Sequence, residues 1–174
     1  MTGADDLKRH IRDVPDFPSP GILFRDITPL LRDPPAFAHA LDLMAGAVRD
    51  LNADAVVGIE SRGFLFGTPI ANRLKLPFIP VRKAGKLPAA RMSVEYSLEY
   101  GNSQLDIHAD ALVRGQRAVI IDDVLATGGT ARAAAKLVEL IGGSVAGLVF
   151  LIELAPLGGR EHLHGYGVQT LIRY

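Results

Sequence analysis

The chain is predicted to fold as an α/β protein with a mainly parallel, twisted sheet flanked by helices. Short apolar runs rich in β-branched residues alternate with longer amphipathic stretches, which is the order of elements in βαβ units. Several of these runs lead directly into turns rich in glycine and charged residues. Such units imply right-handed crossovers, and because the strands are parallel their carboxyl ends meet at one edge of the sheet, where ligands bind.

The N-terminal part of the chain predicts a packed segment followed by a helix. Residues 13–35 are rich in proline and carry large apolar side chains, which favours an irregular but packed segment. In residues 35–51, Phe37, Leu41 and Met44 are spaced by four and three residues. This spacing is typical of an amphipathic helix.

The remaining elements continue the alternation. We expect strands at residues 55–59, 77–81, 119–122, 144–154 and 168–172. The final strand is expected at an edge of the sheet. We expect helices at residues 63–74 and 131–141. Residues 83–98 lack core periodicity and predict a long mobile loop, although the alternating residues 93–101 allow a hairpin arm.

Composition narrows the class of protein. The chain has 174 residues, enough for one domain, and its 48% hydrophobic residues exclude general disorder. The 19 basic and 19 acidic residues cancel, which argues against a bulk electrostatic grip on nucleic acid or an anionic membrane. The absence of cysteine excludes disulfides, thiolate metal sites and a cysteine nucleophile. With no signal peptide in residues 1–10 and no apolar run near the roughly 20 residues of a bilayer span, a cytoplasmic protein is expected.

The most informative segment is residues 118–130. An apolar strand pattern ends in Asp122 and Asp123, a turn of small residues follows, and a helix pattern begins. Backbone N–H groups of such a turn, next to a helix N-terminus, favour a phosphate, and paired carboxylates accept hydrogen bonds from sugar hydroxyls. The alternative is a simple connecting turn, which explains the two carboxylates poorly because they repel each other and lose hydration. The segment predicts a pocket for a sugar phosphate.

Two further turns bring cations to the same edge. Residues 58–64 follow a strand and enter a helix, and Arg62 in this turn is suited to bind a phosphate with two hydrogen bonds. Residues 81–88 follow another strand and carry a cluster of cations attractive to a polyphosphate. These cations are Arg82, Lys83 and Lys86. The alternative for both turns is a solvated charged surface.

Other candidates for chemistry are few. Glu99 is either structural or, if its loop folds over the pocket, a general acid toward a nitrogen, with a pKa raised by apolar neighbours on closure. His162 and His164 lack a third metal ligand and are interpreted as surface residues. No Walker-type phosphate loop, dinucleotide fingerprint or Ser-His-Asp set is found in the sequence.

Residues 119–130 resemble the signature with which type I phosphoribosyltransferases bind 5-phosphoribosyl-1-diphosphate. Other segments are similar to those of the adenine phosphoribosyltransferases, and together the resemblance covers roughly residues 11–174. These segments are residues 16–29, 60–67, 82–88 and 96–101. The resemblance implies the type I phosphoribosyltransferase fold as a single domain, 1–174. It also implies a small N-terminal hood, about residues 1–35, and a mobile loop, about residues 83–101.

The resemblance also implies a reaction. The 5-phosphoribosyl group would pass from 5-phosphoribosyl-1-diphosphate to adenine, giving AMP and diphosphate in purine salvage. Magnesium ion would be carried by the substrate diphosphate, with no direct protein ligand. The implied protein is a cytoplasmic homodimer without nucleic-acid or membrane partners, in which the neighbouring subunit contributes part of the diphosphate site.

Site residues are implied by position in these motifs. The phosphoribosyl site would comprise Asp122, Asp123, Ala126, Thr127, Gly128, Gly129 and Thr130. The diphosphate site would comprise Glu60, Ser61, Arg62, Arg82, Lys83 and Lys86, with a cis peptide bond between the first two. The adenine site would comprise Leu23, Phe24, Arg25 and Leu154. Glu99 would handle the proton on the adenine ring as the catalytic carboxylate.

Two alternatives remain open at this point. One is a non-catalytic protein of this fold that senses phosphoribosyl diphosphate, although such a protein usually adds a DNA-binding segment or loses loop residues. The other is the same chemistry on hypoxanthine or xanthine. The sequence offers cations, a loop and a sugar site but no evident nucleophilic residue, which favours direct displacement by the base.

Overall fold

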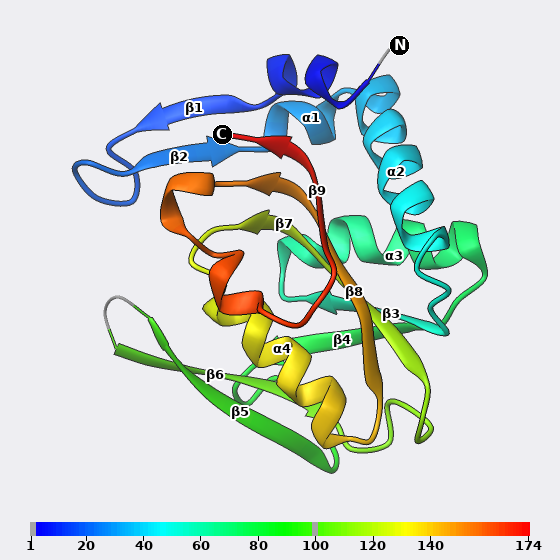
Figure 1. Cartoon of the computed structure of the whole chain (residues 1–174). Helices are drawn as coiled ribbons and strands as arrows, with labels where there is room; N and C mark the ends of the chain where they lie inside the picture. The colour runs from blue at the N-terminus through cyan, green and yellow to red at the C-terminus, as the bar shows by residue number, and fades with distance from the viewer. Residues whose placement is uncertain (1–2, 99–100) are drawn as a thin grey trace. The chain divides into compact units, whose positions relative to one another are not determined.

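The computed structural model describes residues 3–98 and 101–174 and divides into two compact units, Met1–Leu43 and Met44–Tyr174. The first unit contains a 3₁₀ helix, η1 (Ala4–His10), two strands, β1 (Arg12–Pro15) and β2 (Leu23–Asp26), and the helix α1 (Thr28–Arg32). Helix α2 (Pro34–Arg49) begins in this unit and confirms the predicted amphipathic helix. Figure 1 shows the order of these elements along the chain.

The prediction of an irregular segment over residues 13–35 is wrong, because β1 and β2 pair as an antiparallel ribbon. Ion pairs across the ribbon hold it together: Arg12 Nη2 lies 2.6 Å from Asp26 Oδ2, and Arg25 pairs with Asp13. The Phe17 ring packs edge-on against Phe24, with their centroids 5.1 Å apart. Cross-strand charges rather than hydrophobic alternation define this ribbon, so periodicity did not reveal it.

The second unit is built on a seven-stranded sheet of order β5-β6-β4-β3-β7-β8-β9. Its strands are β3 (Ala55–Ile59), β4 (Phe78–Lys83), β5 (Arg91–Leu98), β6 (Gly101–His108), β7 (Arg117–Leu125), β8 (Ser144–Glu153) and β9 (Val168–Arg173). Its helices are α3 (Arg62–Leu74) and α4 (Gly129–Leu140), with short 3₁₀ helices η2 (Ala155–Leu157) and η3 (Glu161–Leu163). The strands from β4 to β9 pair in parallel through β3, β7 and β8, as predicted, and β9 lies at the edge.

The antiparallel hairpin of β5 and β6 replaces most of the predicted long loop and agrees with the hairpin arm that the alternation of residues 93–101 allowed. Residues 91–98 form a strand that pairs with residues 101–108, and β6 in turn pairs with β4. The strand character of 101–108 was not predicted, although Leu105 and Ile107 alternate on the buried face. Within the predicted loop, residues 84–90 connect β4 to the hairpin.

Helices α3 and α4 lie on opposite faces of the sheet because the chain leaves the sheet centre in two opposite directions. The connection from β3 to β4 runs one way along the sheet and that from β7 to β8 runs the other way. Right-handed crossovers in opposite directions place their helices on opposite faces, as Figure 1 shows for α3 and α4. The point where the direction reverses lies between β3 and β7, which is where open α/β sheets bind ligands.

The core of the second unit consists of aliphatic side chains on both faces of the sheet. Val57, Ile120 and Phe150 lie in the central strands, and Ala134 and Leu137 of α4 pack on them. Strands buried on both faces read as continuous apolar runs, which is why β3 and β7 were recognisable in the sequence. None of the helices within residues 3–98 and 101–174 has both the length and the apolar character of a membrane span.

Candidate functional site

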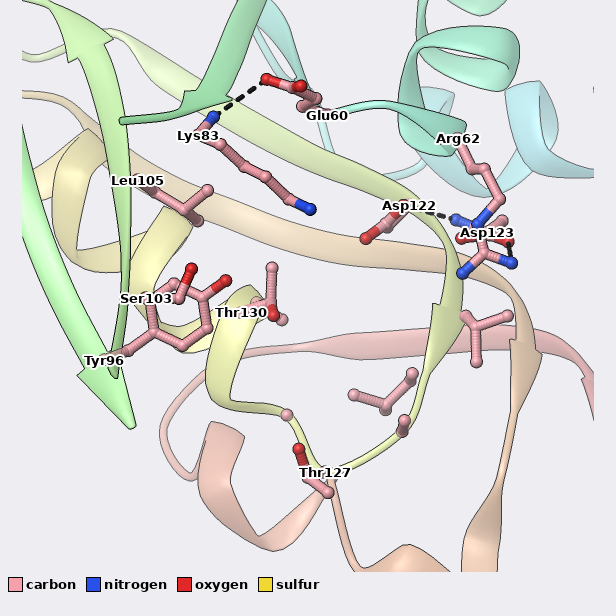
Figure 2. A pocket seen from close by; sticks show the side chains of 15 residues that line it. Glu60, Arg62, Lys83, Tyr96, Ser103, Leu105, Asp122, Asp123, Thr127 and Thr130 are labelled. Carbon is pink, nitrogen blue, oxygen red and sulfur yellow. Dashed lines mark hydrogen bonds and ion pairs between the residues drawn. The ribbon is translucent and has the colours of Figure 1, made fainter. Parts of the chain in front are cut away.

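A cavity of about 330 Å³ lies at the point where the strand order reverses. It receives side chains from the ends of β3, β4 and β7 and from the hairpin, as Figure 2 shows. Arg62 and Thr127, which belong to turns more than 60 residues apart, both line it. The hypothesis that separate turns converge on one pocket is therefore in agreement with the structure.

The paired carboxylates lie inside β7 and not in a turn after it. The predicted strand of residues 119–122 is too short, because β8 continues beside it and pairs with β7 as far as Leu125. Asp123 is only 2% exposed, and Asp122 is half-buried with its Oδ1 accepting a hydrogen bond from the Asp123 N–H at 2.9 Å. Both side chains line the cavity.

The electrostatics of this pair favour protonation. Burial and the neighbouring charge of Asp123 raise the pKa of Asp122 well above its usual value. Burial also raises the pKa of Asp123, although the guanidinium of Arg62 opposes the shift. Burial and mutual repulsion therefore make the charged forms of the two carboxylates costly, and a ligand with hydroxyl groups would supply further hydrogen bonds to them.

Arg62 lies at the start of α3 and reaches Asp123. Its Nη1 is 2.9 Å from Asp123 Oδ2. The approach depends on Gly63, since a Cβ at that position would lie 2.6 Å from the backbone carbonyl oxygen of Ile121 on β7. The sequence placed Arg62 at the correct edge but did not anticipate its ion pair with a carboxylate of the same cavity.

Glu60 organises the cations predicted for a diphosphate. Its Oε1 accepts from Lys86 Nζ at 2.8 Å, and its Oε2 accepts from Arg82 Nε at 3.1 Å and from the Lys83 N–H at 2.9 Å. Burial raises the pKa of Glu60, but these three donors outweigh it and lower the pKa to about 2. The Glu60 side chain thus remains ionised and fixes two cationic side chains near the end of β4.

Lys83 and Ser61, which were also predicted for the diphosphate site, lie beside this cluster. The Lys83 side chain extends into the cavity toward Asp122 (Figure 2). Ser61 connects β3 to α3, and the Glu60–Ser61 peptide bond is cis, as the resemblance implied.

We call residues 126–130 the phosphate loop. Ala126, Thr127, Gly128 and Thr130 line the cavity, and Gly129 begins α4. Gly128 precedes the helix with a φ of 84°, in the left-handed region that favours glycine. The first backbone N–H groups of a helix have no partner within it, so they are available to an anion.

The predicted adenine residues lie in two separate segments. Leu23, Phe24 and Arg25 are consecutive on β2 of the first unit, and Leu154 follows β8 in the second. The Leu154 N–H donates to the carbonyl of Leu125 at 2.9 Å. Glu99 lies outside the described residues. For all five, the assigned roles stay predictions.

Sequence reasoning missed two contributions to the site. The hairpin supplies Tyr96, Ser103 and Leu105 to the cavity; the alternation of residues 93–101 indicated a hairpin arm, but the contribution of Ser103 and Leu105 on β6 was not predicted. His162, interpreted as a surface residue, is exposed but has its Nδ1 2.5 Å from the carbonyl oxygen of Thr127 in the phosphate loop. No local pattern signals that contact, since 35 residues separate the two.

Comparison with known proteins agrees with this architecture. The model of the phosphoribosyl transferase domain family matches residues 26–170. An adenine phosphoribosyltransferase of Carboxydothermus hydrogenoformans is 57% identical over 97% of this chain and 99% of its own length. The crystal structure of the Thermoanaerobacter pseudethanolicus enzyme has a TM-score of 0.96 and 51% identity, covering 98% of this chain and 99% of that one.

A yeast relative was crystallised with ligands. The adenine phosphoribosyltransferase of Saccharomyces cerevisiae, in complex with an imino-altritol bisphosphate and adenine, has a TM-score of 0.91 and 41% identity. The similarity covers 97% of each chain. The matched family model, the identity over nearly the whole length and the shared fold agree with one another. This chain therefore belongs to the adenine phosphoribosyltransferases, within the phosphoribosyl transferase domain family.

Proposed function

We propose that this protein transfers the 5-phosphoribosyl group of 5-phosphoribosyl-1-diphosphate to adenine, producing AMP and diphosphate for purine salvage. The observation that carries the proposal is the lining of one cavity by the carboxylates Asp122 and Asp123, the phosphate loop and the cation Lys83. These are the groups that a sugar with phosphates at both ends requires. The names of the relatives and the adenine bound by the yeast protein support the choice of base.

The phosphoribosyl half of the substrate fits the end of β7. The N–H groups at the start of α4 would bind the 5′-phosphate, because they are unpaired within the helix and carry its positive dipole end. Asp122 and Asp123 would accept hydrogen bonds from the ribose hydroxyls. These bonds would add donors that offset the burial of the two carboxylates and their mutual repulsion.

The diphosphate half fits the cations beyond β3 and β4. Arg62 and Lys83 line the cavity, while Arg82 and Lys86 are held on Glu60 at its side. Departure of diphosphate leaves a ribosyl centre with oxocarbenium character, so the leaving group needs its negative charge stabilised. The proposed role of these cations and of the Ser61 backbone is to hold that charge.

Magnesium ion is proposed to arrive with the diphosphate. Asp122 and Asp123 are the carboxylates at the ribose end of the cavity, and a pair of this kind suits a cation held mainly by substrate oxygens and water. No group of three or more His, Asp or Glu side chains within residues 3–98 and 101–174 converges as a metal site. When bound, the ion would neutralise charge on the departing diphosphate.

Adenine is proposed to bind at Leu23, Phe24, Arg25 and Leu154, with Glu99 managing the proton on its ring. A carboxylate is suited to this task, because closure of the segment over the pocket would exclude water and raise the pKa of Glu99. Exclusion of water also protects the ribosyl centre from hydrolysis. We further propose a cytoplasmic homodimer in which the partner completes the diphosphate site, a state that light scattering would measure.

The test is a direct assay. The protein is mixed with adenine, 5-phosphoribosyl-1-diphosphate and Mg²⁺, and AMP is measured by chromatography. AMP formation that stops with a chelator and returns with Mg²⁺ is expected. Failure to form AMP above background would leave the non-catalytic sensor as the better function. Hypoxanthine and xanthine in the same assay test the choice of base, and faster conversion of either would contradict adenine.

A further inference from the structure

A segment of the second unit that the proposed function does not use lies against the phosphate loop. We call residues 158–164 the bracket; it comprises the Gly158-Gly159 turn, Arg160, η3 and His164. The Nδ1 atom of His162 lies 2.5 Å from the carbonyl oxygen of Thr127. Because a carbonyl oxygen can only accept, Nδ1 carries a hydrogen and donates it.

This hydrogen bond fixes the direction of a backbone N–H group. In a planar trans peptide the C=O and the following N–H point in opposite directions. With the Thr127 carbonyl directed at His162, the N–H of Gly128 points away from the imidazole. The orientation of that N–H, at the N-cap of α4, is therefore set by a side chain 34 residues further along the chain.

The turn of the bracket packs on the loop through backbone alone. A Cβ added at Gly159 would overlap the carbonyl oxygen of Ala126, and a Cβ added at Gly128 would overlap the carbonyl oxygen of Gly159. No side chain can be placed between the two segments without moving one of them. The bracket thus contacts the carbonyl groups of two consecutive peptide units of the phosphate loop, those of Ala126 and Thr127.

The bracket is itself anchored to the sheet and to α4. Arg160 forms two hydrogen bonds with the carboxylate of Glu153 on β8, at 2.6 and 3.1 Å, and its Nη1 donates to the Val168 carbonyl at 2.9 Å. Glu153 is only 3% exposed and also accepts from Thr170 of β9. Arg132 of α4 donates to the His162 carbonyl at 3.0 Å. These contacts make the bracket a rigid support and not a loose loop.

We propose that the bracket is a positioning device for phosphate recognition, in which His162 and Gly159 hold the backbone N–H groups of the phosphate loop in their binding orientation. The inference rests on the proposed function, since it concerns the same ligand. A preformed array of donors binds an anion without first reorganising, so loss of the brace reduces affinity for the phosphorylated substrate.

The experiment measures binding of 5-phosphoribosyl-1-diphosphate with Mg²⁺ by isothermal titration calorimetry, together with steady-state kinetics and melting temperature. His162→Phe keeps the ring but removes the donor, whereas His162→Asn retains an amide N–H at the δ position. We expect His162→Phe to raise both Kd and the KM for phosphoribosyl diphosphate about threefold to tenfold. The kcat and the melting temperature should change little, and His162→Asn should recover most of the affinity.

The matched controls are His164→Phe, which alters the neighbouring exposed histidine, and Gly167→Ala, where a Cβ meets nothing within 4 Å. Gly159→Ala should weaken binding more than tenfold, because its Cβ must displace the loop backbone. Equal affinity of His162→Phe and wild type, or a loss of affinity that His162→Asn does not recover, overturns the bracket. Wild-type protein that neither binds nor converts the substrate overturns the proposed function instead.

Discussion

Two carboxylate sites in the second unit differ in how their charges are satisfied. Glu60 receives hydrogen bonds from Lys86, Arg82 and the Lys83 backbone, and its pKa falls to about 2. Asp122 and Asp123 line the cavity, where Arg62 forms an ion pair with Asp123. Burial nevertheless raises the pKa values of both aspartates. A carboxylate whose charge is stabilised by protein donors contributes to folding stability, whereas one whose charge is costly in the free protein is suited to accept hydrogen bonds from a ligand.

Glu60 and the aspartate pair therefore have different roles, although all three are carboxylates. Glu60 uses its charge to hold Arg82 and Lys86 in place, so its removal should affect folding stability and cation geometry. Ionisation of the aspartate pair costs free energy in the free protein, and hydrogen bonds from ligand hydroxyls would offset that cost. Removal of either aspartate should therefore affect ligand affinity.

Glu60→Gln should lower the free energy of unfolding by up to about 3 kcal/mol at pH 7, since a lowering of the pKa from 4.5 to about 2 corresponds to that order of stabilisation. The folded state holds the Glu60 proton less tightly than the unfolded state does. The stabilisation is therefore present above pH 4.5 and is lost as the pH falls toward 2. Urea denaturation at pH 7, 4 and 3 measures the difference between variant and wild type, which should shrink with acidity. The same difference at all three values would contradict the assignment, and the exposed Glu161→Gln serves as control.

Asp123→Asn should weaken binding of 5-phosphoribosyl-1-diphosphate by roughly tenfold to a hundredfold, the range expected for a lost charge-assisted hydrogen bond. The melting temperature without ligand should stay the same or rise. Calorimetric titration and thermal denaturation measure the two effects, with Asp110→Asn at the surface as control. If the unliganded variant melts far below wild type while its affinity is retained, Asp123 is structural like Glu60.

Glu99→Gln extends the comparison to a third carboxylate, proposed to act on the adenine proton. Turnover should fall at least tenfold, which is about 1.4 kcal/mol of activation barrier, while affinity for phosphoribosyl diphosphate changes little. Steady-state kinetics with both substrates varied separates the two quantities. Unchanged turnover removes Glu99 from the reaction.

Asp122→Asn should stabilise the unliganded protein by about 1 kcal/mol at pH 8. The folded state binds the Asp122 proton more tightly than the unfolded state, so the contribution of Asp122 to stability is favourable in acid and is lost as the pH rises through its raised pKa. The advantage of the variant should therefore shrink as the pH falls from 8 and be lost by about pH 4, near the ordinary pKa of an aspartate. Unfolding curves between pH 4 and 8 measure it, and a variant less stable than wild type at pH 8 would show that the aspartate is satisfied within the fold.

The parts of the fold that were predicted share a local signature. Strands β3 and β7 are continuous apolar runs, and helix α2 has a clear period, so burial pattern alone located them. The β1–β2 ribbon was misread and the β5–β6 hairpin was only partly predicted, because cross-strand ion pairs hold the ribbon and β6 joins the sheet by pairing with β4. Their stability comes from partners that a window of sequence does not contain.

Local pattern was enough to place Asp122, Asp123 and the phosphate loop on one strand–turn–helix unit, because neighbours in sequence on that unit are neighbours in space. The family resemblance added which motifs to expect together. The folded chain was needed to show that Glu60 accepts a hydrogen bond from Lys86, 26 residues away, and that His162 contacts the carbonyl of Thr127. The physical reason is that the state of a charge or a backbone N–H depends on the donors and acceptors folded against it, and these come from distant parts of the chain.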